Sequence, residues 1–177
     1  MQHNPAPSYG WLTGLAVYLN QVAGKGNWAF TGSFAMFCWA WMKDGKAREP
    51  EDIDILVAAN KFENVAYGLN SKLNTRREPF SPPNPISAKA RVPAVLQVGS
   101  GVPEQIQEKS IGIDVLNVHA GRFGNLDNIV FLNNNDNFPV VPIAELIQRK
   151  IDIRNDTGKS EEREKAEKDL AFLKSLQ

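Results

Sequence analysis

The chain has 177 residues, of which 42% are hydrophobic and 23% are charged, and this balance is typical of one globular domain with a single core. Its 20 lysine and arginine residues match its 20 aspartate and glutamate residues, so overall charge does not indicate a protein that binds long nucleic acids or anionic membranes. The one cysteine, Cys38, excludes an internal disulfide and lies in an apolar segment, which predicts a buried side chain rather than a reactive thiol.

The first half of the chain alternates between helical and extended patterns. Apolar residues at helical spacing predict a helix over residues 9–22. A short apolar strand at residues 28–30 leads into a second helix over residues 34–42. Residues 52–57 begin by alternating between acidic and apolar residues, which predicts a strand with acidic side chains on one face and apolar side chains on the other. Residues 61–73 have the pattern of an amphipathic surface helix.

The second half of the chain begins with the proline-rich residues 79–85. We predict a loop there, because proline fixes φ and removes a backbone donor. Strands are predicted after it, at residues 92–98, 111–118 and 128–132. Two helices, at about 142–154 and 160–176, close the chain, and each begins with residues that favour a helix N-terminus. We therefore expect one α/β (α+β) domain over residues 1–177, with a small mixed sheet flanked by helices and two C-terminal helices within 142–176.

Membrane and zinc-binding classes are not indicated. No apolar run approaches the roughly 20 residues that span a bilayer, and the first residues lack the basic start and long apolar core of a signal peptide. Neither His3 nor His119 lies in a spacing typical of zinc ligands. We expect a cytoplasmic protein without a membrane partner.

Gly32 and Ser33 stand where a predicted strand passes directly into a helix. The free N–H groups and the dipole at such a helix start favour a bound anion. Glycine allows a phosphate to approach closely and serine adds a hydroxyl donor. On its own this pair is more typical of an ordinary helix start than of a phosphate site.

Asp52 and Asp54 are two residues apart in a predicted strand, so their carboxylates point to the same face. Two such charges repel each other unless a cation lies between them, and magnesium suits this role because it accepts a few carboxylate oxygens together with substrate phosphates. The alternative is an edge strand with a solvated face. Asp114 lies in an otherwise apolar strand, and if that strand lies beside the first, three carboxylates meet at one site suited to two magnesium ions.

These residues resemble the signature of nucleotidyltransferases of the DNA polymerase β superfamily, in which Gly-Gly or Gly-Ser is followed by Asp, a hydrophobic residue, and Asp or Glu. Here the signature is Thr31-Gly32-Ser33 and then Asp52-Ile53-Asp54-Ile55, with Asp114 resembling the third carboxylate of that superfamily. Gly45 and Arg48 before the acidic pair make the abortive-infection toxin type nucleotidyltransferases the nearest branch.

A late helix resembles that branch too, through residues 145–150, Arg154 and residues 168–170. Lys150 is either a solvated lysine or a contact for the triphosphate, since a lysine point charge stabilises phosphate oxygens. Arg48 either contacts phosphate or solvates its loop. At helical spacing, Asp169 is expected to pair with Lys165 or Lys168.

The resemblance implies transfer of a nucleoside monophosphate from a nucleoside triphosphate to a hydroxyl, with release of pyrophosphate. It implies that Asp52 and Asp54 hold two Mg²⁺ ions, with Mn²⁺ as an alternative, and that Asp114 holds the catalytic ion and helps to orient or deprotonate the acceptor. Gly32 and Ser33 would hold the β- and γ-phosphates, and catalysis would rest on positioning and charge neutralisation.

Several alternatives remain open from the sequence. The acceptor is a tRNA end, a protein side chain or a small molecule, and the partner is a cognate antitoxin or a second copy of the chain. A different class is a catalytically inactive nucleotide-binding or toxin–antitoxin type regulatory module, which binds triphosphate without turnover. A purely structural domain would bind neither metal nor nucleotide through Asp52 or Asp114.

Overall fold

A mixed β-sheet forms the centre of the protein. The computed structural model describes residues 6–7, 10–43, 50, 52–72, 86–96, 105–118, 124–132 and 138–177, so the predicted proline-rich loop and Arg48 lie outside the described residues. Within them the sheet has seven strands, which in spatial order are β1 (Ala6–Pro7), β4 (Ile86–Leu96), β5 (Gln105–Asn117), β3 (Asp52–Val57), β2 (Trp28–Thr31), β7 (Pro139–Val140) and β6 (Val130–Phe131).

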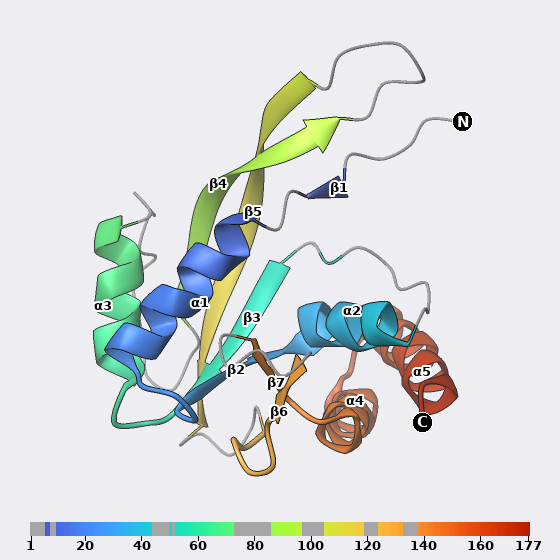
Figure 1. The fold of residues 1–177 in the computed structure, drawn as a ribbon. Helices are drawn as coiled ribbons and strands as arrows, with labels where there is room; N and C mark the ends of the chain where they lie inside the picture. Colours follow the sequence, from blue (N-terminus) through green and yellow to red (C-terminus); the bar gives the residue numbers. More distant parts are fainter. Residues whose placement is uncertain are drawn as a thin grey trace.

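Parallel and antiparallel pairs alternate across the middle of the sheet. β3 runs parallel to β5 and antiparallel to β2, while β2 runs parallel to β7. β4 and β5 form a long antiparallel hairpin that rises beyond the other strands (Figure 1), because β3 pairs only with residues 112–117 of β5. The predicted fold class, a small mixed sheet flanked by helices, is confirmed.

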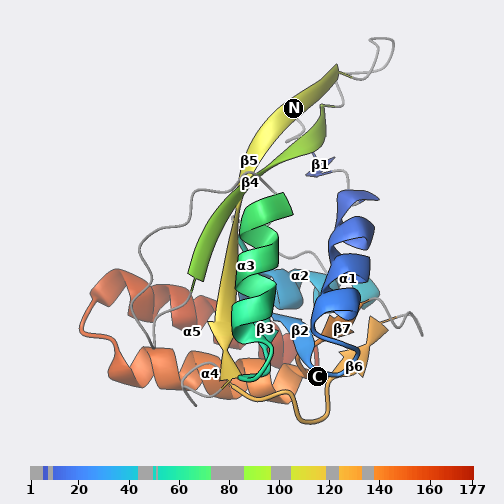
Figure 2. The same ribbon diagram turned by 90° about the vertical axis from the view of Figure 1, so that its left-hand side faces the viewer.

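Helices cover both faces of the sheet. In Figure 2, α1 (Gly10–Val22) and α3 (Phe62–Lys72) lie in front of the sheet, whereas α2 (Gly32–Met42), α4 (Ile143–Asp156) and α5 (Ser160–Ser175) lie behind it. The two predicted C-terminal helices are confirmed as α4 and α5, which pack against each other. None of the helices among the described residues combines the length and apolar character needed to cross a membrane.

The two strands that form this hairpin were predicted with the wrong bounds. β5 begins at Gln105 rather than near residue 111, and β4 begins at Ile86 rather than near residue 92. Residues 105–110 are mostly polar and give no strand pattern by themselves. Their conformation comes from cross-strand pairing, which runs without interruption from Ile86 opposite Val115 to Leu96 opposite Gln105.

An aromatic cluster links the sheet to the start of α2. Phe30 is fully buried, and its ring centroid lies 5.2 Å from that of Trp28, 4.9 Å from that of Phe34 and 5.0 Å from that of Phe138. Edge-to-face and tilted rings at these separations add to the stabilisation from burial itself. The cluster therefore holds the β2–α2 junction, where Gly32 and Ser33 lie, against the core.

Two further contacts fix α2 in place. The indole N–H of Trp39 donates to the carbonyl oxygen of Val141 at 2.9 Å, and the ammonium of Lys43 donates to the carbonyl oxygen of Leu176 at the end of the chain. Cys38 is buried in the same helix, and this burial raises its thiol pKa to about 12, as expected for a core cysteine rather than a nucleophile.

Truncation of the central ring is expected to destabilise the whole domain. Phe30→Ala removes a fully buried aromatic side chain and should lower the free energy of unfolding by about 3–5 kcal/mol. Tyr67→Ala is the control, because Tyr67 is 70% exposed, and surface truncations usually change stability by less than about 0.5 kcal/mol. Urea titrations of both variants measure the difference. Similar losses in the two variants would contradict this account of the core.

Candidate active site

The strand register brings three carboxylates onto neighbouring strands. On β3, Asp52 and Asp54 alternate with Ile53 and Ile55, which are fully buried on the opposite face. In the parallel pairing of β3 with β5, Asp54 is the direct partner of Asp114. Because adjacent strands lie roughly 4.8 Å apart, the structure groups the three predicted acidic residues at one position of the sheet.

Two glycines leave room for these carboxylates. Gly32 begins α2 with a positive φ of 60°, and a β-carbon there would collide with the carboxylate of Asp54. A β-carbon at Gly112, the β5 partner of Asp52, would likewise collide with the Asp52 carboxylate. Sequence reasoning identified Gly32 but missed Gly112, although its position two residues before Asp114 in a strand indicated a shared face.

The first turn of α2 also contributes a hydrogen-bond donor. The backbone N–H of Ser33 donates to the carboxylate of Asp54. The N-terminus of a helix stabilises negative charge through its free N–H groups and its dipole. In this structure, therefore, the helix start that was expected to hold a phosphate lies directly against the acidic residues of β3.

The carboxyl group of Asp54 has a raised pKa. Its pKa is raised from 3.8 to about 6, chiefly by burial and then by the negative charges of Asp114 and Asp52. The positive charge of Lys150 and the Ser33 N–H act in the opposite direction without cancelling the rise. The neighbouring carboxylates therefore disfavour a further negative charge at Asp54, and a bound cation would relieve this repulsion.

The carboxylates do not form a complete cage for a metal ion. No three histidine, cysteine, aspartate or glutamate side chains in the described segments are arranged so that they hold an ion by themselves. Mg²⁺ usually takes one or two carboxylates and fills its remaining positions with water and substrate phosphates. The oxygen donors and the repulsion that Asp114 and Asp52 exert on Asp54 fit an ion that binds together with a triphosphate.

Lys150 on α4 is not a solvated surface lysine. Its ammonium lies 2.6 Å from the Asp169 carboxylate of α5, and the two side chains are only 13% and 11% exposed. The prediction that Asp169 pairs with a lysine of its own helix is therefore wrong, and Lys168 pairs instead with Glu164 at 2.6 Å. Asp169 lies on the buried face of α5, where its carboxylate contacts Lys150 of α4.

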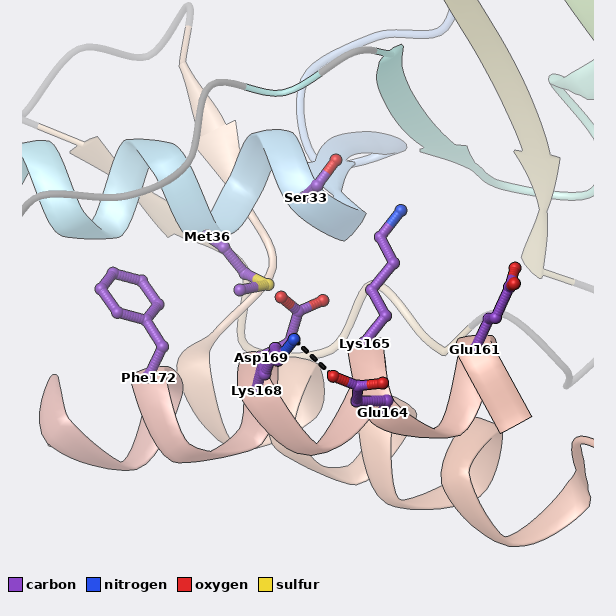
Figure 3. Close-up of a pocket in the computed structure, with 8 residues that line it drawn as sticks. All are labelled: Ser33, Met36, Glu161, Glu164, Lys165, Lys168, Asp169 and Phe172. Atoms are coloured by element: carbon purple, nitrogen blue, oxygen red, sulfur yellow. Dashed lines mark hydrogen bonds and ion pairs between the residues drawn. The ribbon is translucent and has the colours of Figure 1, made fainter. Parts of the chain in front are cut away.

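A pocket of about 520 Å³ separates α2 from α5. Figure 3 shows Lys165 extending from α5 toward Ser33 at the start of α2, with the Asp169 carboxylate below it. Met36 and Phe172 form its apolar wall farther along the two helices. Because Ser33 belongs both to the pocket lining and to the hydrogen bond with Asp54, the pocket adjoins the acidic residues.

Comparison with solved structures identifies the fold. The chain has the nucleotidyltransferase fold. It is similar to an antigenic nucleotidyltransferase-like protein from Paracoccidioides brasiliensis, with a TM-score of 0.57 and 15% identity. The alignment covers 98% of this chain and 79% of that one. The small alarmone synthetase 2 from Bacillus subtilis aligns with a TM-score of 0.37 and 14% identity over 94% of this chain and 90% of that one. No family model and no curated protein sequence matches the chain.

The two glycines are expected to respond differently to a methyl group. Gly32→Ala forces a residue with a side chain into a left-handed conformation against the partly buried Asp54, and should lower the free energy of unfolding by about 1–3 kcal/mol. Gly112→Ala meets the end of the exposed Asp52 side chain, which can turn aside, so the expected change is below about 1 kcal/mol. Chemical denaturation of both variants makes the comparison, and equal losses would contradict it.

Asp54→Asn should stabilise the metal-free protein at neutral pH. The folded-state pKa of Asp54 is about 6 against an ordinary value of 3.8, so the folded state binds the proton more tightly than the unfolded state. The ionised carboxylate therefore reduces stability as pH rises from about 4 to above 6. We expect the variant to match the wild type near pH 4 and to exceed it by on the order of 1 kcal/mol at pH 7.5. Denaturation in EDTA across this range measures the difference, and a wild-type advantage at pH 7.5 would refute it.

Proposed function

We propose that the protein transfers a nucleoside monophosphate from a nucleoside triphosphate to a hydroxyl acceptor and releases pyrophosphate. The observation that carries the proposal is the pairing of Asp54 with Asp114 on adjacent strands, with Asp52 on the same face of β3 and the start of α2 alongside. A fold alone does not define an activity, and the site residues are therefore the basis of the proposal.

The acidic residues have separate roles in this proposal. Asp52 and Asp54 bind two divalent cations, Mg²⁺ or Mn²⁺, and Asp114 binds the ion nearest the acceptor. When bound to these carboxylates, such ions would supply positive charge that stabilises the transferred phosphoryl group. Asp114 also orients the acceptor hydroxyl and accepts its proton. The raised pKa of Asp54 supports cation binding, because a cation would relieve the repulsion among these carboxylates.

Positive groups around the acids bind the triphosphate in this proposal. Lys150 already acts electrostatically on Asp54 from α4, so an anion bound beside the acids would lie within reach of its charge. Gly32 and Ser33 offer the N-terminal backbone of α2, which favours phosphate oxygens. Arg48 precedes β3 in the sequence and is proposed as a further phosphate contact.

The acceptor is an RNA end, a protein side chain or a small molecule. Arg48, Asp52, Asp54 and Lys150 follow the sequence pattern of the abortive-infection toxin type nucleotidyltransferases, and we place the chain nearest that type. In that setting its partner is a cognate antitoxin or a second copy of the chain.

A second candidate is a nucleotide-binding regulatory module without turnover, for which the α2–α5 pocket beside Ser33 would be the binding site. Such a module would bind triphosphate in the pocket between α2 and α5 and would leave the acceptor unmodified.

Asp114→Asn should abolish transfer while preserving the fold. The substitution keeps the shape of the side chain but removes a carboxylate from the cation site, and losses of at least about 100-fold in rate are expected when such electrostatic stabilisation is removed. The assay incubates each of the four α-³²P-labelled nucleoside triphosphates with cell extract and Mg²⁺ or Mn²⁺. It follows the ³²P label in the acceptor and measures the unlabelled pyrophosphate separately. Asp127→Asn is the matched control, because Asp127 is exposed in the turn before β6 and belongs neither to β3 nor to β5.

The outcomes separate the two candidates. Transfer by the wild type and by Asp127→Asn, with loss in Asp114→Asn, supports the enzyme. Triphosphate binding without transfer under any condition supports the regulatory module. Undiminished transfer by Asp114→Asn would refute the proposed role of the acidic residues.

A further inference from the structure

The ion pair between Lys150 and Asp169 is unusual because of its burial. The ammonium and the carboxylate lie 2.6 Å apart, and their side chains are 13% and 11% exposed. Burying two charges costs several kilocalories per mole, and apolar residues of similar volume often stabilise a core as well or better. A buried pair that packing alone does not require therefore indicates a role for the charges themselves.

The sequence of α5 shows that Asp169 occupies a core position. Buried residues on one face of the helix are Ala166, Leu170 and Leu173. Asp169 lies within that face, and 8% of the whole residue is exposed. An apolar residue would continue this stripe without a desolvation cost. The other described ion pairs of α5, such as Lys168 with Glu164, lie in solvent and contribute little.

The pair also connects the acidic residues with the pocket. Lys150 acts on Asp54 through its positive charge, and Asp169 lines the pocket between α2 and α5 together with Ser33. Figure 3 shows the Asp169 carboxylate directed toward α2 and Lys165 reaching toward Ser33 above it. The Lys150 ammonium thus lies between the acidic residues of the sheet, represented by Asp54, and the α2–α5 pocket, represented by Asp169.

We propose that Asp169 is a positioning residue that holds the Lys150 ammonium at this boundary, so that Lys150 meets the terminal phosphates of a triphosphate extending into the α2–α5 pocket. This inference rests on the proposed function. Without Asp169 the flexible lysine side chain would have no fixed partner on α5 and would lose its orientation toward the phosphate. Asp169 itself touches neither the reacting phosphorus nor the acceptor.

Calorimetric titration of the full chain with inorganic tripolyphosphate and Mg²⁺ tests the inference without requiring catalysis. Asp169→Asn should weaken tripolyphosphate binding about tenfold, equivalent to about 1.4 kcal/mol, and Asp169→Glu should recover part of the affinity. In the transfer assay, Asp169→Asn should raise KM for the triphosphate more than it lowers kcat.

A double variant separates positioning from structural support. Lys150→Met with Asp169→Leu replaces the ion pair by apolar side chains of similar size, and should restore the free energy of unfolding to at least the wild-type value. Its tripolyphosphate affinity should stay as low as that of Lys150→Met alone. Recovery of both stability and affinity would show that the pair is only a structural support and would overturn the inference.

The failures of the two proposals give different results. Wild-type protein that binds neither tripolyphosphate nor nucleoside triphosphate would refute the proposed function and the inference together. Wild-type binding and transfer that remain unchanged in Asp169→Asn would refute the inference alone. Glu162→Gln is the control, because Glu162 also lies on α5 but is paired with Lys159 in solvent and does not belong to the pocket lining, and it should leave the affinity unchanged.

Discussion

The register of two parallel strands places Asp54 beside Asp114. The two carboxylates repel each other, and neighbouring groups offset part of that repulsion. Negative charge in a partly buried position is unfavourable unless donors or cations offset it. The Ser33 N–H and the charge of Lys150 offset part of it, and the pKa of Asp54 nevertheless remains near 6. The fold thus maintains a destabilising charge cluster, as is common where a site is prepared for a ligand.

The C-terminal helices belong to this arrangement and are not an appendage. α4 contributes the lysine that acts on the acidic strand, and α5 contributes the carboxylate that pairs with it. α5 is also tied to α2 at its far end by the contact of Lys43 with Leu176. As a result, one pocket wall comes from the helix that starts at Gly32 and the other from the last helix of the chain.

The similarity to the Paracoccidioides protein extends over 98% of this chain at 15% identity. At that identity the common feature is the arrangement of strands and helices, which is maintained by burial and pairing rather than by particular side chains. The proposed chemistry therefore depends on a small number of residues whose types and positions the fold does not require. Asp114 and Gly112, adjacent on one face of β5, are examples, because an apolar strand would pair equally well without them.

The sequence by itself determined the local features of the protein. Alternation of acidic and apolar residues from Asp52 to Ile55 determined that Asp52 and Asp54 share a face. Helical spacing with favourable starts determined α4 and α5. These are short-range properties, set by the two-residue period of a strand and by helix-capping preferences. The transition from β2 into α2 at Gly32 was also readable, because it depends on adjacent residues.

Only the tertiary structure decided which distant residues meet. Strand order set the pairing of Asp54 with Asp114. Because α4 packs on α5, Asp169 forms its ion pair with Lys150 and not with a lysine one turn away on its own helix. The length of β5 was likewise set by pairing with β4, since residues 105–110 carry no strand pattern. Contacts between segments far apart in the chain depend on how whole elements pack, and local residue patterns do not contain that information.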